Sequence, residues 1–378
     1  MTSSNVLAQV LFEEKSANNG YKIAMATLNV PKSLNALNLS MIKLLHKQLT
    51  AWLTDPEIAV IMLMGSGEKA FCAGGDVVSL YHDIIKQRSK QPNKPVSDEQ
   101  AQQYLAVDFF TQEYQLDLLI HQAKKPILAW ANGYVMGGGI GLMAGASHRV
   151  VTEKTLMAMP EVTIGLYPDV GASWFLNQMP QGIGLFLGLT GMTFNAQDAL
   201  YIGLADCFID SKNKAGVIAQ LLAVNWHKNE ETNQQLLSSL LDTMSVDDKQ
   251  LECATLLSQW PLIKTVTATD DINTIYKAIV DAESDSNWFQ KAQQKIIHGS
   301  PLSLHLINQQ LMRCKGLSLQ TCFERELSLS LRCCQHSEFV EGVRALLVDK
   351  DKQPRWKYCD VNSVDNNEVD WFFTSVSK

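Results

Sequence analysis

The sequence predicts an α/β fold in which a wound core is followed by a helical region. Short apolar runs that are typical of buried strands alternate with helical patterns over the first 210 residues. Two glycine-rich turns each follow such a run and open a helix. Beyond residue 211 the strand signal fades, and amphipathic helical patterns dominate to about residue 345. We therefore expect an α/β core at residues 1–210 and a mainly helical region at residues 211–378, packed on the core.

The N-terminal elements are a hairpin, a helix and a buried strand. Two β-rich runs between Val6 and Leu28 flank "NNG", and Asn and Gly tolerate the positive φ that a tight turn requires. The segment "LSMIKLLHKQLTAWL" then repeats apolar residues at helical spacing. The wholly apolar run "IAVIMLMG" follows it and predicts a strand that is covered on both faces.

The same alternation continues along the rest of the core. We expect a helix after Gly75, one strand over "PILAWANGYV", a helix through "MGGGIGLMAGA" and one β run over "HRVVTEKTLMAM". Between Lys86 and Gln103 the composition is polar and basic, which predicts an exposed insertion. A helix that is capped by Ser97, with Gln100 three residues on, should follow this insertion.

Charge and composition exclude several classes of partner. The net charge of −7 comes from residues of both signs scattered along the chain, so neither nucleic acid nor an anionic membrane is expected to bind. No run of eighteen apolar residues predicts a membrane span. The eight cysteines lack a C-x-x-C pair, and the start of the chain lacks a signal-peptide pattern, so we expect reduced thiols and a cytoplasmic location. No metal site is expected, because the histidines lack partners at metal-site spacing.

The two glycine turns carry the strongest chemical signal. "FCAGGD" and "MGGGIG" each place backbone N–H groups at a helix N-terminus, where they have no intrahelical acceptor. Two such donors that converged on one carbonyl oxygen would form an oxyanion hole. Either turn alone can also be only a tight connection, for which glycine is the favoured residue.

Two other readings compete for these stretches. Gly139, Gly141 and Ala144 match the G-x-G-x-x-A dinucleotide fingerprint, with Glu161 about twenty residues further on, which would indicate a nicotinamide-dependent oxidoreductase. That fingerprint leaves the first glycine turn unexplained. Gly171, Ala172 and Ser173 begin a G-x-S nucleophile-elbow pattern, but Phe175 stands where the elbow needs its second glycine.

A pair of acids lies in "MPEVTIGLYPDV", where Glu161 and Asp169 each adjoin a proline among aliphatic residues. The prolines restrict the backbone beside each acid, and apolar surroundings raise the pKa of a carboxyl group that is not hydrogen bonded. Two acids whose environments separate their pKa values can divide the work of a reaction, one as general base or nucleophile and the other as general acid. This pair therefore predicts acid–base or nucleophilic chemistry.

Together, "LNALN", "KAFCAGGD", "GYVMGGGIGL" and "MPEVTIGLYPDVGASWFL" resemble the crotonase (enoyl-CoA hydratase/isomerase) superfamily. The resemblance is to its 3-hydroxyisobutyryl-CoA hydrolase branch, and "EGVRALLVDKDKQPRWK" extends it to the tail. It implies a crotonase-like β-β-α spiral core with coenzyme A lying across it. It also implies a hydrolase of a short β-hydroxyacyl-CoA that acts in valine breakdown and needs no metal or redox cofactor.

The resemblance also implies roles for individual residues. The backbone N–H groups of Gly75 and Gly138 would hold the thioester oxygen. Glu161 would be the principal catalytic carboxylate, as general base or as nucleophile, and Asp169 would contact the substrate hydroxyl and position water. Glu113 would bind substrate, and the loop "PKSLNALN" would place Ala36 at the adenine and Lys32 at a phosphate of coenzyme A.

Two further functions remain open from the sequence. Hydratases of this superfamily typically carry a second glutamate three residues after the oxyanion glycine, and Gly141 occupies that position here. This departure favours hydrolysis over a hydratase or isomerase. A non-catalytic coenzyme A-binding protein would retain the same loops. Relatives assemble as trimers and hexamers, so a homo-oligomer is also conceivable.

Overall fold

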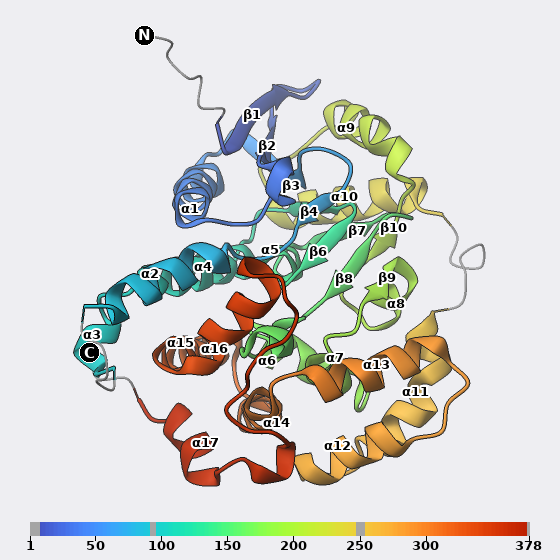
Figure 1. Ribbon diagram of the computed structural model, residues 1–378. Helices are drawn as coiled ribbons and strands as arrows, with labels where there is room; N and C mark the ends of the chain where they lie inside the picture. Colours follow the sequence, from blue (N-terminus) through green and yellow to red (C-terminus); the bar gives the residue numbers. More distant parts are fainter. Residues whose placement is uncertain (1–7, 91–95, 247–253, 376–378) are drawn as a thin grey trace. The chain divides into compact units, whose positions relative to one another are not determined.

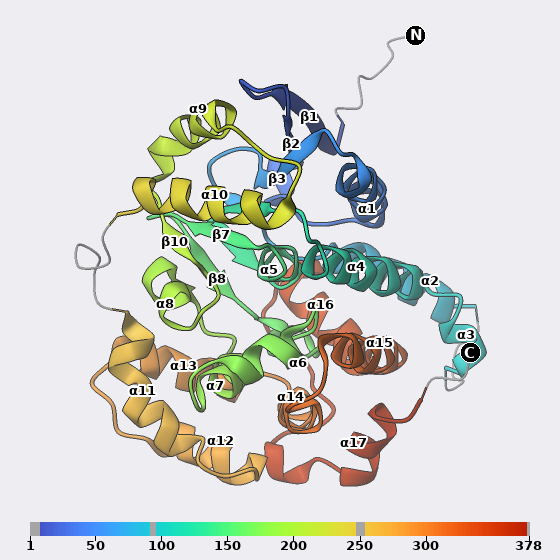
Figure 2. The same ribbon diagram turned by 180° about the vertical axis from the view of Figure 1, so that it is seen from behind.

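The computed structural model describes residues 8–90, 96–246 and 254–375 (Figures 1 and 2). The chain divides into two compact units, each of which is built from three segments. The first unit comprises residues 1–75, 115–157 and 195–252, and the second comprises residues 76–114, 158–194 and 253–378. The α/β class and the C-terminal helical region are as predicted, whereas the two-part division at residue 210 stays a prediction.

The first unit contains a six-stranded sheet in the order β1-β2-β3-β5-β7-β10. Its first pair is the antiparallel hairpin, and the remaining pairs are parallel. A second sheet has the order β4-β6-β8-β9. The strands are β1 (Val10–Ser16), β2 (Lys22–Leu28), β3 (Ile58–Gly65), β4 (Ala70–Cys72), β5 (Ile127–Ala131), β6 (Tyr134–Met136), β7 (His148–Val151), β8 (Leu156–Ala158), β9 (Phe194–Asn195) and β10 (Cys207–Phe208).

Helices cover the larger sheet of this unit. Helices α9 and α10 lie over one face, where Met62, Met64 and Trp130 of the strands pack against Leu221 and Leu237 of the helices (Figure 2). Because side chains alternate along a strand, the intervening residues of β2 and β3 face the other way, and α1 packs against the same strands. The helices are α1 (Leu39–Thr54), α5 (Gly138–Ala144), α8 (Ala196–Tyr201), α9 (Lys214–Ala223) and α10 (Glu230–Met244).

The second unit is helical and is organised around α14. Most of α14 is buried, and α6, α7, α12 and α17 pack against it. Helix α4 (Leu105–His121) begins in this unit. The other helices are α2 (Val77–Arg88), α3 (Asp98–Ala101), η2 (Glu161–Ile164), α6 (Ala172–Phe175), α7 (Ile183–Thr190), α11 (Thr255–Val266), α12 (Ile272–Asp281), α13 (Asn287–His298), α14 (Pro301–Cys314), α15 (Leu319–Gln335), α16 (Ser337–Val343) and α17 (Asn366–Phe372).

Several local predictions are confirmed. The hairpin turns at Gly20, which has a φ of +90°. Helix α1 and strand β3 occupy the predicted segments. Ser97 and Gln100 form the predicted capping box at the start of α3. The seven cysteines in the described residues are free thiols.

Other local predictions were wrong. The expected single strand over residues 126–135 is two strands, β5 and β6, in different sheets, because the chain turns at Gly133 with a φ of +77°. The run over residues 148–159 is likewise split into β7 and β8. The insertion expected to start at Lys86 begins later, because α2 continues to Arg88, and residues 91–95 lie outside the described residues. The apolar run "ALLV" after Arg344, which resembles a short strand in the sequence, belongs to a π-helical turn, η6 (Arg344–Val348).

Candidate functional site

The two glycine turns meet within the first unit. Gly75 follows β4, and Gly138 is the first residue of α5. A Cβ atom on Gly74 would lie 3.8 Å from the backbone nitrogen of Gly138 and 3.2 Å from the carbonyl oxygen of Met136. Gly74 also has a φ of +104°, which favours glycine. The close approach of the two turns therefore depends on a residue without a side chain.

The loop at residues 31–38 is hydrogen bonded to the first glycine turn. Leu37 N donates to Gly74 O at 2.8 Å, and Ala73 N donates to Leu34 O at 3.0 Å. Lys32 is exposed on this loop, and Ala36 is half-buried. The structure therefore holds the loop backbone at Leu34 and Leu37 against the turn at residues 73–75.

Asn35 holds this loop, and the sequence analysis missed it. Its buried side chain accepts from Val30 N at 3.0 Å and donates to the carbonyl oxygens of Ser66 and Ala70 at 3.0 and 2.9 Å. Asn35 has a φ of +58°, in the left-handed region that Asn tolerates better than most residues. An asparagine after the turn-forming segment "PKSL" was the available signal.

The three predicted carboxylates are buried together in the second unit. Glu113 comes from α4, Glu161 is the first residue of η2, and Asp169 lies between η2 and α6. Their exposed fractions are 2%, 5% and 5%, so none of the three is a solvated surface acid. Helices α7, α13 and α16 pack against η2 and enclose the segment that starts at Glu161.

Burial and mutual repulsion control the charge of these carboxyl groups. Burial raises the pKa of Glu161 well above its usual range, and the charges of Asp169 and Glu113 raise it further. Burial, and then the Asp169 charge, raise the pKa of Glu113 well above its usual range. Burial raises the pKa of Asp169 to about 6, although a hydrogen bond from Tyr114 opposes the rise. Because three buried carboxylates cannot easily all be ionised, the group can both hold and accept protons near neutral pH.

Two carboxylate oxygens in this group have no partner. Within the described part of the chain, Glu113 Oε1 and Glu161 Oε2 are buried and accept no hydrogen bond. An unpaired buried carboxylate oxygen is costly and uncommon in native proteins. These atoms are therefore free to bind a substrate group or water.

A chain of three hydroxyl groups ends at Asp169. The Tyr114 hydroxyl donates to Asp169 Oδ2 at 2.5 Å and lies 2.7 Å from Ser330 Oγ. Ser330 Oγ is 2.9 Å from the Tyr167 hydroxyl, which donates to the carbonyl oxygen of Glu326 at 2.7 Å. These four contacts need four hydrogens to be hydrogen bonds at the same time, but the three hydroxyl groups supply only three when Asp169 is ionised. A proton on Asp169 would supply the fourth. The chain therefore couples the charge of Asp169 to the direction of its hydrogen bonds.

The turn that follows Asp169 is strained. Val170 has a φ of +53°, which is rare for a β-branched residue and costs on the order of 1–3 kcal/mol. Asp169 O accepts from Ala172 N at 2.8 Å, and this bond closes the turn. The fully buried Glu326 accepts hydrogen bonds from Gly171 N and Ser173 N on the far side of the turn. The sequence analysis identified neither Glu326 nor the Tyr114–Ser330–Tyr167 chain.

The described residues contain neither a membrane-spanning helix nor a metal-binding group of side chains. Within residues 8–90, 96–246 and 254–375, no helix combines the length and the apolar character that a bilayer crossing requires. The same ranges contain no group of three or more His, Cys, Asp or Glu side chains that could hold a metal ion together.

Comparison with known proteins identifies what the whole chain is similar to. The family model for enoyl-CoA hydratase/isomerase matches residues 23–373. Human mitochondrial 3-hydroxyisobutyryl-CoA hydrolase is 35% identical over 369 residues, which cover 97% of this chain and 89% of that protein. The Danio rerio protein of the same name is 35% identical over 379 residues, with coverages of 100% and 92%.

Solved structures resemble the fold along nearly its full length. An enoyl-CoA hydratase from Rhodobacter sphaeroides superimposes with a TM-score of 0.81 at 28% identity and covers 97% of this chain and 98% of its own. A carnitinyl-CoA dehydratase from Mycobacterium thermoresistibile gives a TM-score of 0.82 at 28% identity, with 98% of both chains covered. Both comparisons agree with the predicted α/β core and C-terminal helical region.

Proposed function

The chain belongs to the enoyl-CoA hydratase/isomerase family of acyl-CoA enzymes, and on this premise we propose that it hydrolyses the thioester of a short β-hydroxyacyl-CoA. The proposed substrate is 3-hydroxyisobutyryl-CoA, as in valine breakdown. The names of the full-length relatives support this choice. The observation that carries the proposal is a buried Glu161 whose Oε2 accepts no hydrogen bond among the described residues. The charges of Asp169 and Glu113 act on this carboxyl group and raise its pKa.

In the proposed reaction, Glu161 is the principal catalytic carboxylate. By one route it removes a proton from water, whose oxygen attacks the thioester carbon while the sulfur leaves and is protonated as the free thiol. By the other route Glu161 attacks that carbon itself, the thiolate leaves, and water then cleaves the resulting mixed anhydride. Asp169 contacts the substrate hydroxyl and positions water, and Glu113 binds the substrate.

The backbone groups have a separate proposed task. The N–H groups of Gly75 and Gly138 stabilise the oxygen on which negative charge develops, as donors in oxyanion holes do. Ala36 contributes a carbonyl oxygen to the adenine amino group, and Lys32 contacts a phosphate of coenzyme A. Lys32 is exposed, so we expect its contribution to binding to be small.

Two alternatives remain. The similar solved structures are called a hydratase and a dehydratase, and this favours reversible addition of water as the second candidate. That chemistry typically uses a second glutamate in the family, and Gly141 has no side chain at the matching position. A coenzyme A-binding protein without activity is the third candidate. The dinucleotide reading loses support, because a Cβ atom on Gly139 would lie 2.2 Å from Cys72 O, so packing of α5 accounts for this glycine.

Release of free thiol separates these candidates. The protein is incubated with 3-hydroxyisobutyryl-CoA and, separately, with crotonyl-CoA, and a thiol reagent follows the reaction. Prompt thiol release from the first substrate supports hydrolysis. Hydration of crotonyl-CoA without thiol release would instead indicate the hydratase, and binding without any turnover would indicate the third candidate.

Glu161→Gln tests the central residue. The substitution keeps the shape of the side chain and removes its charge, so we expect kcat to fall by at least about a hundredfold while coenzyme A still binds. Asp169→Asn should also be severely impaired. Glu324→Gln, which alters an exposed acid on α15, is the matched control and should behave like the wild type. A Glu161→Gln variant with most of its activity would refute the assigned role.

Two coarser expectations accompany the function. We propose a cytoplasmic location on the basis of the free thiols in the described residues, whereas the names of the relatives place those proteins in mitochondria. Cell fractionation distinguishes the two compartments. A homo-oligomer, as found among family members, is checked by light scattering.

A further inference from the structure

Helix α15 supplies the contacts that fix the turn after Asp169, although it lies far along the chain. Glu326 of α15 is fully buried. Its Oε2 accepts from Gly171 N at 2.7 Å, and its Oε1 accepts from Ser173 N at 2.9 Å and from the Ser173 hydroxyl. Both carboxylate oxygens are therefore used by one turn.

The geometry of that turn explains why it needs support. With a φ of +53° at Val170 and +86° at Gly171, it has the φ values of a type I′ turn. Gly, Asn and Asp dominate both central positions of such turns, and a β-branched residue is disfavoured there. A free segment of this sequence would therefore adopt another conformation, and Asp169 would move with it.

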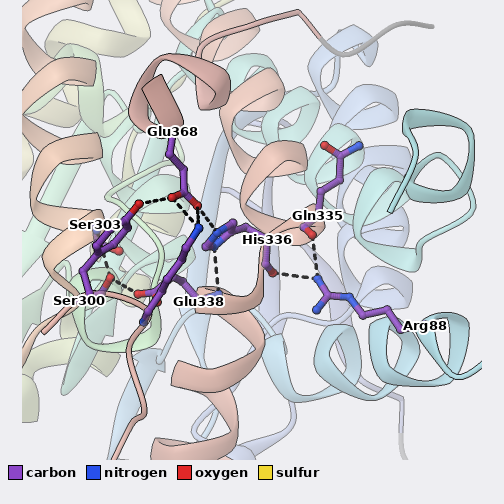
Figure 3. Close-up of polar contacts among 9 residues, drawn as sticks. Arg88, Ser300, Ser303, Gln335, His336, Glu338 and Glu368 are labelled. Atoms are coloured by element: carbon purple, nitrogen blue, oxygen red, sulfur yellow. Dashed lines mark hydrogen bonds and ion pairs between the residues drawn. The ribbon is translucent and has the colours of Figure 1, made fainter. Parts of the chain in front are cut away.

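The helix that carries Glu326 is itself held firmly in the second unit. Ser330 lies one turn further along α15 and contacts the tyrosine hydroxyl that binds Asp169. At the end of α15, Arg88 Nη2 donates to the carbonyl oxygens of Cys334, Gln335 and His336 at 3.0, 3.0 and 2.8 Å. Figure 3 shows Arg88 directed at this helix end and His336 in contact with Glu368 of α17. His336 Nε2 lies 2.7 Å from Glu368 Oε1.

We propose that Glu326 is a positioning residue for Asp169, which holds the strained turn through Gly171 and Ser173 and so fixes where the carboxylate of Asp169 points. The catalytic part of this inference rests on the proposed hydrolase function. The structural part, that Glu326 and Val170 depend on each other, does not.

Glu326→Gln tests the catalytic part. The assay is run above pH 8, because burial raises the pKa of Glu326 to about 8 and the ionised carboxylate can accept all three hydrogen bonds. The amide nitrogen of Gln would face an N–H donor of the turn, so at least one of these hydrogen bonds is lost although the shape is kept. We expect kcat for thiol release to fall about tenfold or more, with KM changed by less than about twofold, because substrate binding elsewhere is intact. Glu324→Gln on the exposed side of α15 is the control and should leave both constants unchanged.

A double-variant cycle tests the structural part. Val170→Gly removes the cost of positive φ, so the turn should depend less on Glu326 in that background. For the double variant Val170→Gly with Glu326→Gln, we expect a loss of kcat that is at least about threefold smaller than the product of the two single losses. Its fall in thermal midpoint should also be smaller than the sum of the two single falls.

The outcomes keep the two proposals apart. Wild-type protein without thiol release would end the hydrolase proposal, and the midpoint cycle would still decide whether Glu326 holds the turn. An active wild type with independent effects at positions 170 and 326 would overturn the inference alone. If Glu326→Gln does not fold, Ser173→Ala removes one donor to Glu326 and should give a smaller effect of the same kind.

Discussion

At the scale of single residues, the hydrogen bond from Tyr114 to Asp169 has a predictable effect on pH dependence. This bond favours the ionised form of Asp169 and opposes the rise of its pKa to about 6. Tyr114→Phe should therefore raise the pKa of Asp169 further. A carboxylate accepts hydrogen bonds from a hydroxyl group and from water better than a protonated carboxyl does, so we expect Asp169 to act in its ionised form. The acidic limb of kcat/KM against pH should then move up by about one unit.

The control for this prediction is Tyr21→Phe, which changes a half-buried tyrosine of the first unit. Its profile should match that of the wild type. A Tyr114→Phe profile that stays in place, or moves to lower pH, would contradict the assignment of Asp169 as a group that works ionised.

A residue of the site could be predicted where its neighbours in the sequence marked it, and not where only a contact distant in the sequence did. Glu161 and Asp169 adjoin prolines in one short segment, so local sequence indicated them. Glu113 was indicated only by the resemblance, and no local pattern showed that this residue is buried. Glu326 lies four residues after the buried Cys322 and four residues before the buried Ser330. Helical periodicity could therefore have placed this acid on the buried face of its helix. Its contact with Gly171 joins residues 155 positions apart, and no pattern in one sequence reveals such a pairing.

At the scale of elements, the packing of α5 on β4 depends on Gly139. A Cβ atom there would lie 2.2 Å from the carbonyl oxygen of Cys72, which is backbone and cannot turn away. We expect Gly139→Ala to destabilise the protein by about 1–3 kcal/mol, as overpacking does. It should also reduce activity, since α5 begins at Gly138.

Gly216→Ala is the matched control for this prediction. Gly216 lies inside α9, and its added Cβ would meet only the end of Met244 at an ordinary 3.6 Å. Alanine there should stabilise the helix by about 0.5–1 kcal/mol. Urea unfolding of both variants checks the two signs, and a neutral Gly139→Ala would show that α5 is not close-packed on β4.

The elements that the sequence predicted well are those that local periodicity defines. Helix α1 and strand β3 were located because their apolar patterns are long and regular. The split between β5 and β6 was missed because "PILAWANGYV" is apolar throughout, and only Asn132 and Gly133 mark the point where the chain changes sheet. At the scale of the chain, each compact unit joins three separate segments, and the division expected at residue 210, where the strand signal fades, stays a prediction.

At the scale of the whole molecule, buried carboxyl groups set the pH dependence of stability. Burial raises the pKa of Glu326 to about 8 and that of Asp169 to about 6, while the pKa values of Glu113 and Glu161 are also raised. In the unfolded chain these acids ionise near pH 4, so between about pH 4 and pH 8 the folded state binds more protons than the unfolded state. The free energy of unfolding must then fall as pH rises.

Buried histidines act in the opposite direction, but only in acid. Burial lowers the pKa of His121 to about 4, and it also lowers those of His148, His305 and His336. Their unfolded forms have pKa values near 6.5 and are still about half protonated at that pH, so the histidines reduce stability as the pH falls below about 7.5. Above about pH 7.5 the carboxyl groups therefore act almost without this opposition.

We therefore expect the midpoint of urea unfolding to be lower at pH 8.5 than at pH 7.5. Glu326 should account for part of the difference, because its pKa of about 8 lies within this range. In Glu326→Gln this group cannot titrate, so the midpoint of the variant should fall less between the two pH values, although the variant should be less stable at pH 7.5. A wild-type midpoint that rises between these two pH values would show that the buried acids are ionised at little cost, and the proton-holding role of the cluster around Glu161 would fail with it.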